Sequence, residues 1–459
     1  MNDTRSSEQE QHYGNRVYPI ADAIPMEQLD AEAEYLDGLA DKPLPQRLLG
    51  YFKLGGPGFM AAAATLGAGT LTSAMISGAA FGYKLLWISW VAIGSGLFMM
   101  AAMARFTTHG GFRVMQKQRE RHGWFMAKIL TGVIGLLSIA IIFNFGQVAL
   151  GTHLVESIGE QVGVHLPQAL NWPLYVALTA WISLSYGRGS RGVLYVERFM
   201  KGALLLMVLC FGACLVVVGV DWPAALRGFF IPWLPKGQQG VDIFIASSAA
   251  AIGVADWVFY HYAGLAKGWG PKHEKLARVD TVFGLALPFV VVSFIVVSLF
   301  AATLHGQAEL PETAAALSQA LVPLLGERFA AIAFMVGFLA VPVTTSVVLG
   351  IICAMAMHEI FEWEPDVRSR RWKLCVLMPQ VALLGAFLPS PILLIIVIAA
   401  LLSVTNNMVG WSFFLLLNDR EVMHEHRSKS YLWNLGILVQ VTLLNCVAIM
   451  WVYNRLGYW

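Results

Sequence analysis

Eleven long apolar stretches follow one another along most of this 459-residue chain. Each is long enough to cross about 30 Å of hydrocarbon as a helix. Inside a bilayer every backbone N–H and C=O group needs a partner within the chain, so such stretches fold as helices. We therefore expect an all-α polytopic membrane protein with spans near 57–80, 85–107, 125–151, 172–187, 199–220, 241–265, 280–304, 328–357, 372–388, 391–417 and 431–454.

The basic residues predict how these spans are oriented. If the N-terminus is cytoplasmic, all but five of the 31 Lys and Arg residues fall in cytoplasmic segments. This bias is what the positive-inside rule expects, and one missed span would invert every later loop. We therefore expect a multi-pass protein of the cell inner (plasma) membrane, with the N-terminus inside and the C-terminus outside. The five exceptions are Lys84, Arg227, Lys236, Arg328 and Arg455.

The segment before the first span is different in character. Residues 1–45 are polar and rich in Asp and Glu, and they lack the apolar core of a cleavable signal peptide. We expect residues 1–55 to form a cytoplasmic acidic tail, largely disordered, with a short amphipathic helix around Met26–Leu39. Residues 56–455 would then form the transmembrane domain.

The first span carries an unusual centre. The stretch from Gly56 to Trp87 reads GPGFMAAAATLGAGTLTSAMISGAAFGYKLLW, with Gly67 and Gly69 in its middle, beside Thr70. Glycine is less favourable than alanine in a helix by about 1 kcal/mol. Either the helix is interrupted here and lines a cavity, or its small residues allow close helix–helix contact.

Polar side chains also lie deep in other spans. Asn144 and Gln147 are three residues apart, so they share one helix face; they could bind a solute or tie helices together. A carboxylate in the sixth span, Asp256, costs about 2.5–3.5 kcal/mol on insertion scales and is a functional candidate. Alternatively, helix N-termini or a buried cation could satisfy it. Interruptions at matching places in spans one and six indicate two inverted five-helix halves, with a site between them.

Several motifs resemble one family. GPGF, the small-residue run and SGAAFGYKLLW are similar to the first membrane helix of the Nramp family of proton-coupled divalent metal transporters. The Ser/Thr-rich run at Thr344–Ser346 and the LNDREVM end of the tenth span also resemble that family. The resemblance covers roughly residues 46–450. It implies a LeuT-like fold, an inverted 5+5 repeat plus one further helix.

The residues that would bind metal in that family differ here. The resemblance aligns the family's Asp-Pro-Gly-Asn break with Gly67–Thr70, and its Met-Pro-His with Val254–Asp256, so the Asp, Asn and Met ligands are lost. Asn144 and Gln147 stand where the family commonly carries an Asp and a Glu used for proton movement. His261 falls on a histidine that the family also has.

We therefore expect an Nramp-like secondary transporter with an altered site, taking up a small uncharged polar solute such as a monosaccharide together with protons. The alternative is a divalent cation transporter, with Mg²⁺ favoured over Mn²⁺ or Fe²⁺, because hydrated Mg²⁺ needs only one or two carboxylates. Asp256 and His261 are the candidates for proton coupling. The substrate-binding candidates are Gly67, Gly69, Thr70, Asn144, Gln147, Asp256, Trp257, Tyr260, Asn406 and Asn407.

No catalytic motif is recognised, so we do not expect an enzyme. The expected partners are the solute, protons and the lipid bilayer. We expect no cofactor, no resident metal and no nucleic acid. The sequence does not indicate an oligomeric state.

Overall fold

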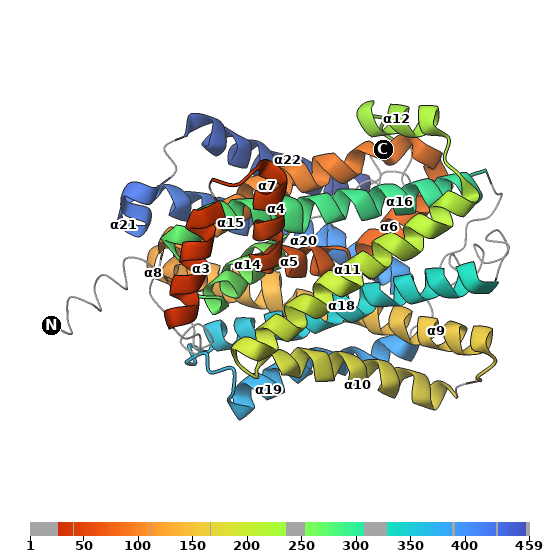
Figure 1. Cartoon of the computed structure of the whole chain (residues 1–459), viewed down its shortest axis with the longest axis horizontal. Helices are drawn as coiled ribbons and strands as arrows, with labels where there is room; N and C mark the ends of the chain where they lie inside the picture. The colour runs from red at the N-terminus through yellow and green to blue at the C-terminus, as the bar shows by residue number, and fades with distance from the viewer. Residues whose placement is uncertain are drawn as a thin grey trace.

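The computed structural model describes residues 26–39, 41–110, 112–165, 167–235, 253–306, 328–387, 391–427 and 430–455. Over these residues it is a bundle of helices without a β-strand. Figure 1 shows the long helices running between two ends of the molecule, horizontally in that view. The expected all-α polytopic architecture is confirmed.

Helices lie over the expected spans. Five described helices are long and apolar enough to cross a membrane, and the bent α5–α6 pair makes a sixth. Part of the expected sixth span, residues 241–252, lies outside the described residues, so the number eleven stays a prediction. The helices are α5 (Pro57–Thr65), α6 (Ala68–Phe81), α7 (Trp87–Arg105), η3 (Phe125–Leu137), η4 (Ile139–Phe143), α9 (Asn144–Val162), α10 (Gln168–Tyr186), α11 (Ser190–Val218), α14 (Val254–Ala266), η6 (Asp280–Ala286), α16 (Leu287–Thr303), α18 (Arg328–Ile360), α19 (Arg370–Leu377), η8 (Met378–Phe387), α20 (Pro391–Asn418) and α22 (Tyr431–Arg455).

The centre of the bundle is built from α5, α6, α14 and α18, whose described side chains are mostly buried. Small residues let these helices approach closely. At Gly78, for example, a Cβ atom would lie 2.4 Å from the carbonyl oxygen of Val297 on α16. By contrast α11 exposes large apolar side chains such as Leu209 and Val216, as expected of a helix that faces lipid.

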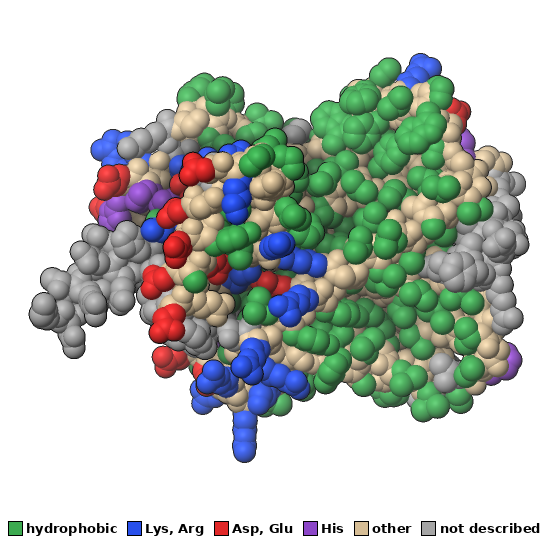
Figure 2. Space-filling model, in the orientation of Figure 1, with side chains coloured by type: hydrophobic (Ala, Val, Ile, Leu, Met, Phe, Trp, Pro, Cys, Tyr) green, Lys and Arg blue, Asp and Glu red, His purple; other side chains and the backbone are tan. Residues whose placement is uncertain are grey.

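Charged residues gather at one end of the molecule. In Figure 2, Lys, Arg, Asp and Glu side chains cluster at the end that carries α3 (Met26–Leu39) and α19, while hydrophobic side chains cover much of the rest of that face. We call this the charged end; the loop charges predict that it is cytoplasmic.

The shorter described helices are α8 (Val114–Trp124), α12 (Trp222–Phe230), α15 (Glu274–Val279), α21 (Arg420–Met423) and the single turns η1 (Gly82–Leu85), η2 (Phe106–Gly110), η5 (Pro271–His273) and η9 (His424–His426).

The N-terminal region contains more helix than the sequence indicated. Helix α3 has the bounds expected for the amphipathic helix, and it buries Leu29, Ala33 and Leu39 almost completely. A second helix, α4 (Leu44–Leu54), follows and leads directly into α5. Residues 1–25, expected to be disordered, lie outside the described residues, and the boundary at residue 55 stays a prediction.

Candidate functional site

The first span is interrupted between α5 and α6, which meet at an angle of 54°. Gly67 begins α6 with an extended backbone that any residue could adopt, so space rather than conformation favours glycine there. A Cβ atom on Gly67 would lie 3.0 Å from Thr345 Oγ1 and 3.1 Å from Thr345 Cγ2. Of the two alternatives that the sequence left open, the structure shows an interrupted helix, and the small residue also allows α18 to approach it closely.

Hydroxyl groups lie beside the carbonyls that end α5. Thr344 Oγ1 on α18 lies 3.2 Å from Ala63 O and 3.0 Å from Val341 O of its own helix, and Thr345 Oγ1 lies 3.3 Å from Ala63 O and 3.4 Å from Ala64 O. Thr70 Oγ1, from the first turn of α6, donates to Thr65 O at 2.7 Å. Helix ends leave carbonyls without intrahelical partners, and here hydroxyl groups from α6 and α18 lie within reach of them.

The N-terminus of α6 is capped from α9. The Ala68 N–H donates to Gln147 Oε1 at 3.1 Å. Because a backbone N–H can only donate, the amide of Gln147 must turn its oxygen toward Ala68. Its Nε2 is buried and has no hydrogen-bond partner within the described part of the chain. Gln147 therefore brings an unused N–H donor to the interruption.

Asp256 lies in the first turn of α14, facing the end of α5. Its Oδ2 accepts a hydrogen bond from the Gly253 N–H at 3.0 Å, and its Oδ1 lies 3.1 Å from Thr65 Oγ1. The side chain is partly exposed. The carboxyl group of Asp256 thus caps the N-terminus of its own helix, which is one of the two ways in which we expected the protein to satisfy it. It also bridges spans one and six.

Asn406 on α20 completes the described part of the site. Its Oδ1 accepts a hydrogen bond from the Val254 N–H at 3.0 Å. A Cβ atom on Gly253 would lie 2.9 Å from Asn406 Nδ2, so glycine allows α20 to touch the start of α14. The structure therefore brings Gly67, Thr70, Gln147, Asp256 and Asn406 together around two helix ends.

Asn144 serves a helix contact instead. Its Nδ2 donates to Pro379 O at 2.9 Å, and its Oδ1 accepts from Ser346 Oγ at 2.6 Å. Tyr175 OH lies 2.8 Å from the same serine hydroxyl. The side chain of Asn144 therefore ties α9 to α18 and η8. Of the two roles that the sequence left open, solute binding or helix contact, Asn144 has the helix contact.

The two aromatic candidates point away from the interruption. Trp257 packs edge-on against Phe413 of α20, with ring centroids 6.4 Å apart. Tyr260 OH donates to Ala277 O of α15 at 2.9 Å. Both rings are buried, and no described contact links them to Gly67 or Thr70. Gly69 is buried in the first turn of α6, and Asn407 is partly exposed beside Asn406.

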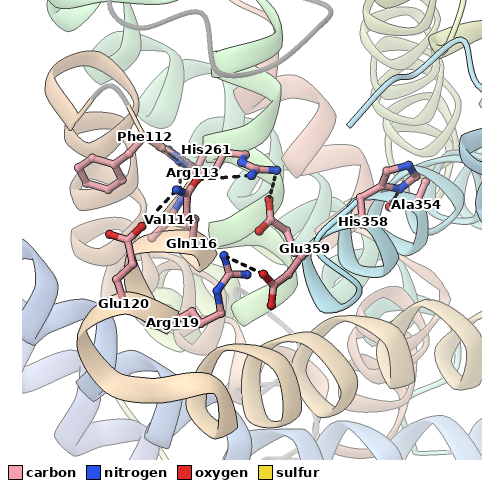
Figure 3. Close-up of polar contacts among 11 residues, drawn as sticks. Phe112, Arg113, Val114, Gln116, Arg119, Glu120, His261, Ala354, His358 and Glu359 are labelled. Atoms are coloured by element: carbon pink, nitrogen blue, oxygen red, sulfur yellow. Dashed lines mark hydrogen bonds and ion pairs between the residues drawn. The ribbon is translucent and has the colours of Figure 1, made fainter. Parts of the chain in front are cut away.

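His261 lies at the charged end of α14, away from Asp256. Its Nδ1 is 3.0 Å from Thr107 Oγ1, and its Nε2 is 3.0 Å from Phe112 O. Figure 3 shows it beside Arg113, whose guanidinium points at Glu359 with a nitrogen–oxygen distance of 3.1 Å. The two proton-coupling candidates are thus not in contact, and a buried ion pair that the sequence analysis missed lies next to the histidine.

Two further residues of the site were missed, Thr65 and Thr345. The Ser/Thr-rich run VPVTTSVVLG signalled polar groups in α18, but nothing in one sequence shows that Thr345 faces the end of α5. Within the described ranges, no group of three or more His, Cys, Asp and Glu side chains is arranged to hold a metal ion.

A first span that is interrupted inside the bundle, with its broken ends beside the start of α14, is typical of membrane transporters built from broken helices. The chain belongs to the Nramp family: the model described as natural resistance-associated macrophage protein-like matches residues 58–453. It is 26% identical over 347 residues to the divalent metal cation transporter MntH of Mycobacterium tuberculosis, covering 72% of this chain and 75% of that protein. It is 28% identical over 197 residues to natural resistance-associated macrophage protein 2 of Rattus norvegicus, covering 41% of this chain and 33% of the relative.

Solved structures agree on the fold. The manganese transporter of Eremococcus coleocola superposes with a TM-score of 0.72 at 14% identity, covering 88% of this chain and 86% of that one. The nucleobase-cation-symport transporter Mhp1 superposes with a TM-score of 0.58 at 16% identity, covering 87% and 93%. The chain therefore has the expected LeuT-like fold.

Proposed function

We propose that the protein is a secondary transporter of a small neutral polar solute, such as a monosaccharide, and that it couples transport to protons. The observation that carries this proposal is the Gln147 Nε2 donor beside the interruption, which has no partner among the described residues. An N–H donor suits a hydroxyl or carbonyl oxygen and repels a cation. Hydroxyl groups also lie within hydrogen-bond distance of the nearby carbonyls of Ala63, Ala64 and Thr65.

Proton binding at Asp256 is supported by the geometry of Thr65. The Thr65 hydroxyl lies 2.7 Å from Ala61 O and 3.1 Å from Asp256 Oδ1. A hydroxyl group has a single proton to donate. When that proton goes to the nearer Ala61 carbonyl, the contact with Asp256 is a hydrogen bond only if the carboxyl group carries a proton. Asp256 is therefore the proposed site of proton coupling.

Divalent cation transport is the second candidate, and the names of the relatives favour it, since the MntH proteins are divalent metal cation transporters. A hydrated Mg²⁺ ion keeps several waters and needs only one or two carboxylates. Asp256 would then supply the carboxylate. Mn²⁺ and Fe²⁺ fit less well, because the Asp, Asn and Met ligands that the family resemblance implies for them are absent at Gly67, Thr70 and Val254.

Flux measurements separate the two candidates. Purified protein in liposomes that enclose a pH-sensitive dye is challenged with monosaccharides, Mg²⁺ and Mn²⁺ in turn. We expect a monosaccharide to acidify the lumen and neither cation to do so. Saturable, acidifying Mg²⁺ or Mn²⁺ uptake without any sugar response would overturn the proposal in favour of the second candidate.

The variant Asp256→Asn tests the role of the carboxyl group. It keeps the shape and most hydrogen bonds while removing the titratable oxygen, so we expect a folded protein with solute transport strongly reduced and no proton movement. Glu160→Gln is the matched control, because Glu160 is exposed at the end of α9 and should leave both fluxes unchanged. If Asp256→Asn moves solute and protons like the parent, Asp256 is structural.

A further inference from the structure

A cavity of ≈ 220 Å³ opens at the charged end, away from the helix interruption. Residues from the end of α7, from α15 and from the start of α22 line it, and Figure 1 shows α7 and α22 along the upper edge of the bundle. Its lining combines two arginines, one carboxylate, a hydroxyl, an indole ring and small apolar side chains: Arg105, Arg278, Glu274, Ser430, Trp433, Ala101 and Ala104.

The charges in this cavity leave it net positive. Glu274 is engaged twice, since it pairs with Arg278 and its other oxygen lies 3.3 Å from His109 Nε2. Arg105 is partly buried and makes no side-chain hydrogen bond or ion pair within the described part of the chain. A half-buried guanidinium with no partner among the described residues can receive an oxyanion, which it can bind through two parallel N–H donors.

An apolar stripe begins beside the cavity and runs along α22. Leu432, Leu435 and Val439 are spaced as i, i+3 and i+7, so they share one helix face, and they are 76%, 42% and 50% exposed. Trp433 borders both regions and packs edge-on against Phe98 of α7, with centroids 5.4 Å apart. Indole rings concentrate at the level of lipid headgroups.

We propose that this cavity binds the phosphate headgroup of an anionic phospholipid in the adjoining leaflet, with the acyl chains lying along the α22 stripe. Basic cavities between membrane helices on the cytoplasmic side are suited to such headgroups. Arg105 and Arg278 receive the phosphate oxygens, and the Ser430 hydroxyl lines the same cavity. The stripe distinguishes a lipid from free phosphate, which has no apolar part to cover it. The transported solute does not enter into this proposal.

Native mass spectrometry of the full chain in detergent tests the lipid site. Protein is titrated with phosphatidylglycerol, phosphatidylcholine or inorganic phosphate, and bound adducts are counted. We expect one phosphatidylglycerol to remain bound under conditions that remove phosphatidylcholine, and inorganic phosphate to compete only weakly. The double variant Arg105→Gln/Arg278→Gln should lower phosphatidylglycerol affinity by about 30-fold, following the attraction of roughly fivefold per basic side chain near an anionic headgroup.

Arg370→Gln is the matched control, because it removes one exposed positive charge of the charged end outside the cavity. It should bind phosphatidylglycerol like the parent, and all variants should elute from size-exclusion columns like the parent. Equal phosphatidylglycerol affinity in the parent and a folded double variant would overturn the proposal. So would equal retention of phosphatidylcholine, or full displacement of the lipid by inorganic phosphate. If the double variant does not fold, Leu435→Asp replaces it as the test. This variant places a charge in the apolar stripe and should weaken phosphatidylglycerol binding. Unchanged binding would overturn the proposal.

Discussion

Gly58 marks the tightest contact at the start of the first span. The Asp280 carboxylate accepts hydrogen bonds from the Gly56 N–H at 3.1 Å and the Gly58 N–H at 2.6 Å, so η6 caps the N-terminus of α5. A Cβ atom on Gly58 would lie 2.2 Å from the backbone oxygen of Asp280. A backbone atom cannot move aside as a flexible side chain can, so only glycine fits here.

Gly58→Ala should therefore destabilise the protein by about 1–3 kcal/mol, the usual effect of overpacking. Gly202→Ala on α11 is the control, since a Cβ atom there meets nothing within 4 Å, and alanine is the better helix former. Thermal unfolding in detergent, followed by intrinsic fluorescence, should give a lower midpoint for the first variant and an unchanged or higher one for the second. Equal midpoints would show that α5 and η6 are not packed this closely.

Gln147 offers a test of which ligand chemistry the site uses. Gln147→Glu keeps the acceptor for the Ala68 N–H but replaces the unused donor with an acceptor. One neutral hydrogen bond contributes about 0.5–1.5 kcal/mol, so we expect solute uptake to fall by roughly two- to tenfold at low concentration. Gln147→Met removes both the Nε2 donor and the acceptor for the Ala68 N–H. Comparing it with Gln147→Glu therefore separates the effect of the donor from that of the helix cap. Divalent cation uptake that rises in Gln147→Glu while solute uptake is unaffected would contradict the proposed donor role.

The junction between α4 and α5 is held by two lysines, one on α11 and one directly after α14. Lys267 Nζ donates to Leu54 O at 2.8 Å and pairs with Glu197 Oε2 at 3.1 Å, while Lys201 Nζ donates to Phe52 O at 3.2 Å. Cations are favourable beside the carbonyls that end a helix. Burial by itself would lower the pKa of Lys267. The nearby carboxylates of Glu197 and Glu32 have the larger combined effect, so the pKa of this lysine is raised.

Lys267→Met should loosen this junction. The variant leaves Glu197 buried without its cation and the Leu54 carbonyl without its donor, and breaking a buried pair from one side is strongly unfavourable. Deuterium uptake over residues 50–58 should rise well above that of the parent. Lys373→Met, at an exposed site on α19, should leave it unchanged. Equal protection in Lys267→Met and the parent would mean that the lysine does not hold α4 against α5.

Much of the fold was predictable because it depends on local patterns. Apolar length located the spans, and the bounds of α3 followed from its amphipathic pattern. Gly67 and Gly69 marked the place where α5 ends and α6 begins, but they did not decide between an interrupted helix and a close helix contact. Packing direction was not predictable from one sequence. Trp257 and Tyr260 adjoin Asp256 in the chain, yet they point toward α20 and α15. Likewise, Gln147 reaches the interruption while Asn144, three residues earlier, binds Ser346.

Orientation of the whole molecule remains a prediction from the loop charges. A single cysteine at Glu120 on α8 should react with an impermeant maleimide only after cells are permeabilised, because the charged end is expected inside. A cysteine at Val164, just after α9 at the opposite end, should react in intact cells. Both positions are exposed. The reverse pattern, with Glu120→Cys labelled in intact cells, would invert the topology.

Metal binding tests most directly whether this member of the Nramp family has exchanged cation chemistry for neutral-solute chemistry. Isothermal titration of the purified protein with Mn²⁺ should show no saturable binding at micromolar concentrations, because the lost Asp, Asn and Met ligands would have to be replaced by water. A monosaccharide titrated under the same conditions should give saturable binding that Asp256→Asn weakens. Micromolar Mn²⁺ binding that disappears in Asp256→Asn would contradict the neutral-solute proposal.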